Sequence, residues 1–210
     1  MNAPVLPADS KDAIAQAARL LTAGGLVVFP TDTVYGVGAH ACDASAVERL
    51  YVAKERPRDM AIPVLLATVA GLPLVAREVP PVARRLAEAF WPGALTLVLP
   101  RRPGLPAILT AGGDSVAVRV PDHPLTRALI TALGAPLAGT SANLSGQPSP
   151  VTAAEVMAYL GGRVDLVLDG GPCPGGIPST VLDLTCDPPR VLRPGPVTEA
   201  ALRTILSSLA

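Results

Sequence analysis

The chain has 210 residues, half of them apolar but only 3% aromatic, and its formal net charge is zero. This length suffices for one substantial core of Val, Leu, Ala and Ile. No apolar run reaches the roughly 18 residues of a membrane span, and "MNAPVLPADS" lacks the basic and apolar regions of a secretory leader. Three cysteines without C-x-x-C spacing and two histidines argue against a metal site, so we expect a reduced, cytoplasmic protein.

Apolar periodicity predicts that helices and strands alternate along the first two thirds of the chain. A helix over 10–25 leads into a buried strand over 26–30, and a second helix over 43–54 begins with Asp43 as its N-cap. The pattern then repeats, with strands predicted over 62–67, 94–100, 115–121 and 135–143 and helices over 80–91, 123–134 and 151–162.

Strands dominate the last third of the chain. They are predicted over 164–171, 179–185 and 190–195, before a closing helix over 198–209. The sequence has no internal repeat and no linker long enough to divide it. We therefore expect residues 1–210 to form a single α/β domain with a mixed sheet.

The stretch "FPTDTVYGVGAHA", residues 29–41, follows a buried strand with a high density of hydroxyl groups. Thr31, Thr33 and Tyr35 stand beside Asp32, and two glycines come next. A turn needs only one or two such residues. This density predicts a pocket wall made of hydroxyl groups.

The stretch "YVAKERPRD" places cations at the predicted end of a helix. Pro57 disfavours helical geometry at Arg56, so we expect the helix to end just before it and the chain to become extended. Alternate side chains of an extended chain share a side, which would bring Arg56 and Arg58 together near Lys54. Such a cluster suits phosphates and need not support the core, but cations are equally typical of an ordinary helix end.

The stretch "GTSANLSGQPSP" predicts a second polar loop. Ser141 and Asn143 are two residues apart and face the same way if the preceding strand continues. The Ser, Gly and Pro residues that follow predict a tight turn whose hydroxyl and N–H groups suit an anion. An ordinary surface turn has the same composition, so the spacing alone leaves both interpretations open.

Arg119 interrupts the apolar strand "SVAVRVP". An unpaired buried guanidinium is costly, so Arg119 either pairs with a carboxylate of the chain or binds an anionic ligand. The later stretch "GGPCPGGIPST" is rich in glycine but lacks the Lys of a P-loop. Its Cys173 has no histidine nearby in the sequence, so we do not expect a nucleophilic cysteine.

The order of these motifs is more specific than any one of them. In sequence, "FPTDTVYGVG", "KERP", "WPGALTLVL", "VAVRVP", "SANLSGQPSP", "STVLDL" and "VLRPG" resemble the YrdC-like family, the threonylcarbamoyl-AMP synthases. The resemblance covers about residues 10–195. Lys54-x-Arg56 and Ser141-x-Asn143 resemble the two signature pairs of the family, and the chain length resembles its short, single-domain form.

The resemblance implies a twisted, open α/β sheet flanked by helices, with a concave basic surface. It also implies a nucleotidyltransferase that converts L-threonine, bicarbonate and ATP to L-threonylcarbamoyladenylate and pyrophosphate. The adenylate would supply N6-threonylcarbamoyl modification at position 37 of tRNA, through transfer-step proteins of that pathway. ATP would be a substrate accompanied by Mg²⁺, a direct contact with tRNA is compatible with the resemblance, and no membrane is involved.

The resemblance assigns roles to individual residues as well. The two signature pairs would be the catalytic groups. The positions expected to contact ATP are Lys54, Arg56, Met60, Ser115, Ser141, Asn143, Ser149 and Arg193. The positions expected to contact threonine are Thr33, Leu65, Arg119, Gly139 and Ser179, with Arg119 on the carboxylate and Gly139 acting through its backbone.

Two residues depart from the family pattern. Met60 stands where a polar residue often contacts ATP, which leaves a backbone or apolar contact at that position. Leu65 stands where many members carry a histidine near threonine. Both departures weaken the expected contacts, whereas the signature pairs are intact.

Two other functions would require features that the sequence lacks. A non-catalytic RNA-binding module of the same fold would need exposed aromatic residues for base stacking, and the sequence shows no such pattern. An enzyme resembling dihydroxybutanone-phosphate synthase would need clustered carboxylates to hold Mg²⁺, and Asp32 alone is poor support.

Overall fold

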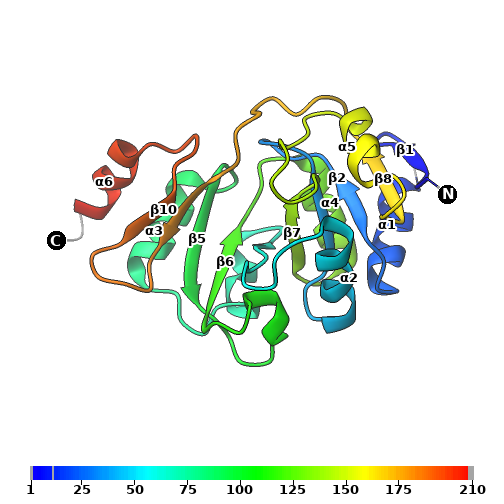
Figure 1. The fold of residues 1–210 in the computed structure, drawn as a ribbon. Coiled ribbons are helices and arrows are strands. Elements are labelled where there is room, and N and C mark those ends of the chain that lie inside the picture. The colour runs from blue at the N-terminus through cyan, green and yellow to red at the C-terminus, as the bar shows by residue number, and fades with distance from the viewer. Residues whose placement is uncertain (1, 11, 208–210) are drawn as a thin grey trace.

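The computed structural model describes residues 2–10 and 12–207, and the ten strands in those ranges join one mixed sheet (Figure 1). The strands are β1 Val5–Pro7, β2 Val27–Phe29, β3 Gly36–His40, β4 Val64–Leu65, β5 Leu95–Pro100, β6 Ser115–Arg119, β7 Leu137–Ser141, β8 Leu166–Asp169, β9 Thr180–Asp183 and β10 Arg190–Arg193. Their order is β1-β8-β2-β3-β7-β4-β6-β5-β9-β10. Since β2 pairs in parallel with β8 and antiparallel with β3, the predicted mixed α/β sheet is confirmed.

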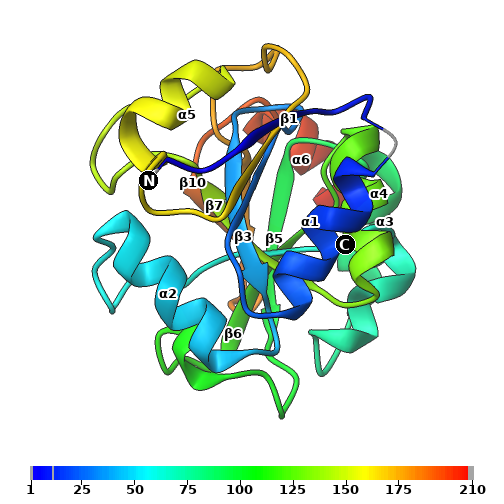
Figure 2. The same cartoon turned by 90° about the vertical axis from the view of Figure 1, so that its right-hand side faces the viewer.

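Helices cover both faces of this sheet. They are α1 Ala13–Thr22, α2 Ala44–Lys54, α3 Pro81–Phe90, α4 Pro124–Leu133, α5 Ala153–Leu160 and α6 Glu199–Ser207, with short 3-10 helices at Val69–Leu74 and Ala107–Thr110. Figure 2 shows α1, α3 and α4 on one side of the sheet and α2 and α5 on the other. In the described ranges, none of these helices has the length and apolar character needed to cross a membrane.

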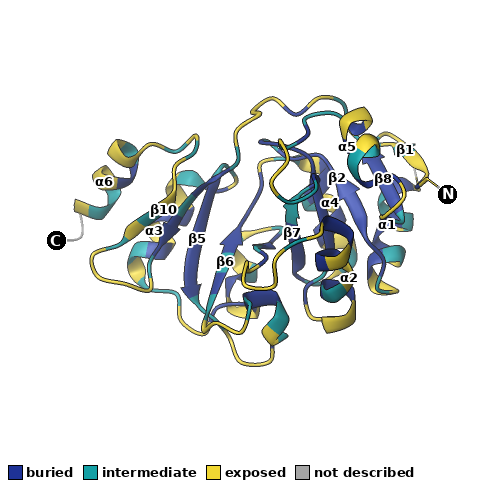
Figure 3. Ribbon diagram, viewed as in Figure 1, coloured by how far each residue is buried: buried dark blue, intermediate teal, exposed yellow. Residues whose placement is uncertain are grey.

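Side-chain alternation along β2 divides the core into two layers. Val27 and Phe29 belong to the cluster that packs α1 and α4 against the sheet, whereas Val28 belongs to the cluster that includes α2. Successive residues of a strand face opposite sides, so a strand covered on both faces is apolar throughout. Figure 3 shows the central strands buried and the exposed residues gathered on loops and outer helix faces.

The predicted helix ends are confirmed where a local cap specifies them. The Asp43 carboxylate accepts two backbone hydrogen bonds at the start of α2, which ends at Lys54 as expected. Thr152 and Glu155 form a reciprocal capping box at the start of α5. The closing helix ends at Ser207 in the described ranges, and the last residues of its predicted range lie outside them.

Two strands of the sheet have no clear signal in the sequence. β1 is three residues long and, among the described strands, pairs only with β8. β3 contains Gly36 and Gly38, and glycine usually disfavours a strand. A Cβ atom would lie 2.7 Å from the Phe29 ring at Gly36 and 3.0 Å from it at Gly38. The two glycines therefore let this ring lie against β3, and the hydroxyl-rich stretch is half loop and half strand.

Candidate active site

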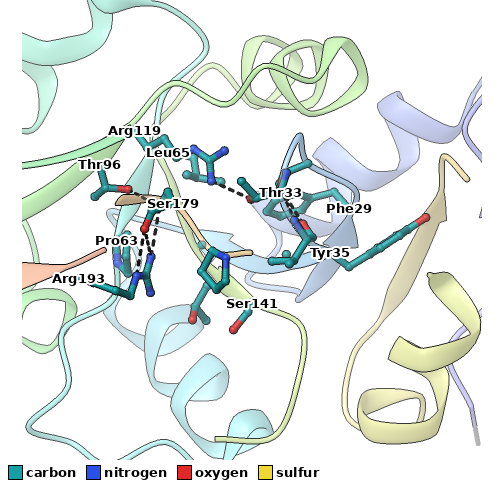
Figure 4. A pocket seen from close by; sticks show the side chains of 16 residues that line it. Phe29, Thr33, Tyr35, Pro63, Leu65, Thr96, Arg119, Ser141, Ser179 and Arg193 are labelled. Atoms are coloured by element: carbon teal, nitrogen blue, oxygen red, sulfur yellow. Dashed lines mark hydrogen bonds between the residues drawn. The ribbon is translucent and has the colours of Figure 1, made fainter. Parts of the chain in front are cut away.

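A polar pocket opens near the middle of the sheet, where the loop between β2 and β3 meets several strands (Figure 4). Its cavity volume is about 100 Å³. Its lining combines hydroxyl, guanidinium and carbon groups, which suits a small polar solute.

All five residues expected to contact threonine line this pocket. β7, β4 and β6 are neighbours in the sheet, which brings Gly139, Leu65 and Arg119 together. Thr33 comes from the loop after β2, and Ser179 directly precedes β9. Sheet topology therefore builds the pocket from residues that are distant in the sequence.

Arg119 ends β6, is only 6% exposed and bonds three groups of the chain. Its Nη2 donates to the Asp32 carboxylate at 2.6 Å, its Nη1 to Thr33 Oγ1 at 3.0 Å and its Nε to the Gly93 carbonyl oxygen at 2.8 Å. The intramolecular ion pair is thus present, and the guanidinium still lines the pocket. Burial lowers the pKa of Arg119, while the Asp32 charge opposes that shift.

The hydroxyl groups of the β2–β3 loop do not all serve the pocket. Thr31 and Thr33 line it, and their Oγ1 atoms bond each other at 2.9 Å. The Tyr35 hydroxyl instead donates to the Gly171 carbonyl oxygen at 2.8 Å, and Figure 4 shows it pointing away. Burial raises the pKa of this tyrosine. The expectation of a hydroxyl wall is therefore wrong for Tyr35, which ties the loop after β8 to β3.

Ser179 and Arg193 form one hydrogen-bonded unit across the pocket (Figure 4). Arg193 donates from Nε and Nη2 to the Ser179 carbonyl oxygen at 3.0 and 2.8 Å, and from Nη2 to Ser179 Oγ at 3.2 Å. The same Oγ bonds Thr96 Oγ1 at 2.8 Å. The sequence motifs did not predict Thr96 at the site. Like Arg119, however, it is a polar residue within an apolar strand, here "ALTLVLP", and that pattern could have identified it.

Three guanidinium groups influence one another around the pocket. The pKa of Arg193 is lowered first by burial and then by the positive charges of Arg119 and Arg56. Asp32 neutralises one of these charges through its ion pair with Arg119. The remaining positive charge predicts affinity for anionic ligands.

Lys54 is buried and makes structural hydrogen bonds, rather than lying on the surface as a free cation. Its side chain is 1% exposed, and its ammonium donates to the carbonyl oxygens of Ser141 and Asn143. Its own carbonyl oxygen accepts from the Ser145 N–H at 3.0 Å. Burial, and then the charge of Arg56, lowers the pKa of this lysine to about 7. The expectation that Lys54 need not support the core is wrong, because it fastens the loop after β7 to α2.

The chain after α2 turns instead of becoming extended. The Met60 N–H donates to the Pro57 carbonyl oxygen at 3.2 Å. Arg58 pairs with Glu48, whereas Arg56 donates to the Met60 carbonyl oxygen at 3.0 Å. The predicted cluster of three cations is therefore wrong for Arg58, which pairs with Glu48, whereas Arg56 stays near enough to Lys54 for its charge to lower the lysine pKa. Arg56 and Met60 lie outside the pocket lining.

The second signature pair is also divided. Ser141 ends β7 and lines the pocket, but the strand stops there, so Asn143 does not face the same way. Its Nδ2 donates to two carbonyl oxygens of its own turn, and its buried Oδ1 has no partner in the described part of the chain. Ser115, at the start of β6, and Ser149, before α5, lie outside the pocket lining.

Apolar side chains also line the pocket. Leu65 packs directly on Gly139, where a Cβ atom would lie 2.9 Å from Leu65 Cδ1. Phe29 lines the pocket beside them. The absence of a side chain at Gly139 therefore lets Leu65 form a carbon surface where many family members carry a histidine.

Other chemistry finds little support. Within residues 2–10 and 12–207, no group of three or more His, Cys, Asp or Glu side chains is arranged to hold a metal ion. Cys173 is buried, and burial raises the pKa of its thiol, which disfavours the reactive thiolate. The site is thus one of guanidinium groups, hydroxyl groups and backbone amides.

Comparison with known proteins leads to the same family as the motifs. The family model Sua5_yciO_yrdC, described as "Telomere recombination", matches residues 19–195. The chain is 46% identical over 197 residues to the threonylcarbamoyl-AMP synthase of Bacillus subtilis, across 93% of this chain and 57% of that protein. It is 44% identical to the putative threonylcarbamoyl-AMP synthase of Mycobacterium tuberculosis, across 95% of this chain and 92% of that protein.

The fold agrees with the sequence comparison. The structure of Sua5 from P. abyssi complexed with L-threonine superposes with a TM-score of 0.93 at 40% identity, covering 98% of this chain and 61% of that one. The chain thus spans less than two thirds of the Bacillus subtilis and P. abyssi proteins, but nearly all of the Mycobacterium tuberculosis protein. On the combined evidence of motifs, sequence identity and fold, the chain belongs to the Sua5/YciO/YrdC family.

Proposed function

We propose that this protein is a nucleotidyltransferase that makes L-threonylcarbamoyladenylate from L-threonine, bicarbonate and ATP, with release of pyrophosphate. The observation that carries the proposal is the convergence of all five expected threonine contacts on one small pocket. The fold match to a protein solved with L-threonine supports the same ligand. Relatives named as synthases favour catalysis over an RNA-binding module.

The proposed threonine position follows from the chemistry of the pocket walls. The carboxylate lies against Arg119, which has used three of its five N–H donors within the chain. The Gly139 backbone and the hydroxyl groups of Thr33 and Ser179 address the polar groups of the amino acid. Leu65 offers carbon surface to the methyl group.

The proposed reaction needs positioning more than a strong base. The threonine amine adds to the carbon of bicarbonate, and loss of water gives a carbamate anion. A carbamate oxygen attacks the α-phosphorus of ATP, and the bond to the pyrophosphate leaving group breaks as the new P–O bond forms. Since the nucleophile is already anionic, the site must chiefly align it and neutralise phosphate charge.

The nucleotide is proposed to lie across the pocket mouth, because most of the residues expected to contact ATP lie outside the pocket lining. Lys54 and Asn143 would act as positioning residues that hold the end of β7 at Ser141, since both are buried. Together with Ser141 and Arg56 they form the proposed catalytic set, in which Ser141 and Arg56 make the direct contacts. The proposed nucleotide contacts are Arg56, Met60, Ser115, Ser141, Ser149 and Arg193, with Lys54 and Asn143 supporting them from the buried side.

Mg²⁺ is proposed to arrive with ATP as part of the substrate. Mg²⁺ in such sites is commonly held by phosphate oxygens, waters and few protein ligands. The described residues offer no carboxylate cluster for a resident ion, which fits this arrangement.

The wider setting is proposed from the family alone. The adenylate would supply threonylcarbamoyl modification at position 37 of tRNA through transfer-step proteins, in the cytoplasm. We propose that residues 1–210 act as one domain, and that a concave basic surface around Arg56 and Arg193 is where tRNA would make any direct contact.

A pyrophosphate-release assay tests the proposed function. Purified protein with Mg²⁺, ATP and bicarbonate is expected to release pyrophosphate only when L-threonine is added, and L-threonylcarbamoyladenylate should appear in equal amount by mass spectrometry. Release that is independent of threonine, or none at all, would overturn the proposal.

A further inference from the structure

Thr96 is the one residue of β5 whose hydroxyl group reaches the pocket in the described part of the chain (Figure 4). It is only 2% exposed and stands in an otherwise apolar strand. Among the described residues, its hydroxyl has a single hydrogen-bond partner, Ser179 Oγ at 2.8 Å. A valine would fill the same space without burying a polar group. The presence of a hydroxyl group at this position therefore calls for a functional explanation.

The hydrogen bonds of the Ser179 hydroxyl group explain the hydroxyl group of Thr96. A serine hydroxyl has one hydrogen to donate and two lone pairs to accept with. Arg193 Nη2 has hydrogens only to donate, so it occupies one lone pair of Ser179 Oγ, at 3.2 Å. The bond to Thr96 is then donated either by Thr96 or by Ser179.

The two directions differ in what they leave unsatisfied. If Ser179 donates, its only hydrogen is used within the protein and cannot reach a ligand, and the Thr96 hydrogen is left without an acceptor among the described residues. If Thr96 donates, both lone pairs of Ser179 Oγ are filled, and the Ser179 hydrogen is free to point into the pocket. Each direction leaves one hydrogen for the pocket, since both residues line it. Only the second leaves that hydrogen on Ser179, the residue that the proposed function places against the bound amino acid.

We infer that Thr96 is a positioning residue: by donating to Ser179 it turns the Ser179 hydroxyl into a fixed donor toward an anionic oxygen of the bound amino acid. This inference rests on the proposed function, which places a carboxylate and then a carbamate in the pocket. The same Oγ is bonded to Arg193, so the hydrogen-bonded unit of Thr96, Ser179 and Arg193 joins the threonine side of the site to the nucleotide side.

The test compares Thr96→Val, which removes the hydroxyl at nearly constant shape, with Thr96→Ser, which keeps it. In the pyrophosphate-release assay, Thr96→Val is expected to raise the KM for L-threonine about three- to tenfold, the loss of one ordinary hydrogen bond. The KM for ATP should change much less, and Thr96→Ser should restore the threonine KM. In a Ser179→Ala background, Thr96→Val should add no further change, because its target is gone.

Thr180→Val is the matched control. Thr180 is 1% exposed on the neighbouring strand β9, but its hydroxyl donates to the Val197 carbonyl oxygen, outside the pocket lining. This variant should lose stability without a selective rise in the threonine KM. If Thr96→Val fails to fold, Thr96→Ala removes the hydroxyl without adding a methyl group beside Ser179 and makes the same comparison.

The outcomes separate the inference from the proposed function. Wild-type protein without threonine-dependent release would overturn both. An active wild type with an unchanged threonine KM in Thr96→Val overturns the inference alone. Equal rises in both KM values, the same response in Thr180→Val, or a full additional effect on Ser179→Ala would reduce Thr96 to a structural residue and likewise overturn it.

Discussion

The ammonium group of Lys54 is held by two backbone carbonyl oxygens rather than by a carboxylate. Burial lowers its pKa to about 7, whereas a lysine in the unfolded chain titrates near 10.4, roughly three units higher. Between these values the unfolded state binds more protons than the folded state. The free energy of unfolding therefore rises with pH across this window, because the folded protein no longer has to bury a charge.

We expect this linkage to disappear in Lys54→Met, which keeps an unbranched side chain but cannot titrate. From roughly pH 6.5 to 8.5, the free energy of unfolding of the wild type should rise by about 2 kcal/mol relative to the variant. Urea denaturation at both pH values measures the difference, and the other titrating groups cancel in the comparison. Parallel pH dependence in the two proteins would show that the buried lysine keeps an ordinary pKa.

The Arg119–Asp32 pair makes a second prediction at the residue scale. The two side chains are only 7% and 15% exposed, so Arg119→Ala leaves a mostly buried carboxylate without its cation. We expect this variant to lose about 3–5 kcal/mol of unfolding free energy. Arg119→Ala combined with Asp32→Asn should recover much of that loss, because the remaining group is uncharged.

The same variants separate stability from binding. In the double variant we expect the KM for L-threonine to stay about ten- to a hundredfold above wild type, with a smaller change for ATP, since the charged contact to the carboxylate is still missing. Urea denaturation and pyrophosphate release provide the two measurements. A double variant with wild-type threonine KM would mean that Arg119 serves the fold alone.

At the scale of elements, β3 depends on close approach to its neighbours. A Cβ atom at Gly38 would lie 2.7 Å from the Ala138 carbonyl oxygen of β7, and a backbone atom in a paired strand has little room to move. We expect Gly38→Ala to lower the free energy of unfolding by about 1–3 kcal/mol. Gly162→Ala is the matched control, since a Cβ atom there meets nothing within 4 Å.

Thermal unfolding of the two glycine variants checks this prediction. The control should melt within a degree or so of the wild type, or slightly above it, because alanine restricts the unfolded chain. Equal melting temperatures in both variants would show that β3 and β7 adjust to a methyl group, and the close packing around Phe29 would then not be the reason for the glycines.

At the scale of the whole molecule, the pocket ties together β4, β5, β6, β7 and the segments beside β2 and β9. A ligand bound there should therefore stabilise the complete sheet. At about 100 times its Kd, L-threonine should add about 2.7 kcal/mol, or roughly 5–10 °C in Tm for a protein of this size. Thermal melts across a threonine titration measure the shift.

Serine and valine are the matched comparisons for this shift, because each lacks one group of threonine. A missing methyl group costs about 1–3 kcal/mol, whereas a site built to bond a hydroxyl rejects its absence more strongly. The hydroxyl-bearing residues Thr33 and Ser179 line the same pocket as the carbon surface of Leu65. We expect threonine to stabilise most and valine least; equal shifts with serine and valine would contradict this pocket chemistry.

Local patterns were enough to predict much of the architecture. The α2 and α5 caps depend on Asp43, Thr152 and residues within a few positions of them, and the apolar run of β2 is buried wherever the sheet places it. The ordered motifs likewise identified the family and the five residues that meet in the pocket. The helix caps and the buried strand depend on residues close together in the sequence, and the family assignment depends on the identities of the motif residues.

Long-range contacts decided the remaining features. The strand that contains Gly36 and Gly38 pairs with β2 and β7, and a side chain at either glycine would clash with the Phe29 ring. Local propensity does not predict a strand at these glycines. Lys54 is buried rather than a surface cation because its ammonium group meets the backbone of Ser141 at the end of β7, 87 residues further along the chain. Thr96 joins the site because Ser179 is brought beside it across the β5–β9 pair. The role of each of these residues depends on which distant segment packs against it. The order of strands in the sheet determines that segment, and the residues adjacent in the sequence do not.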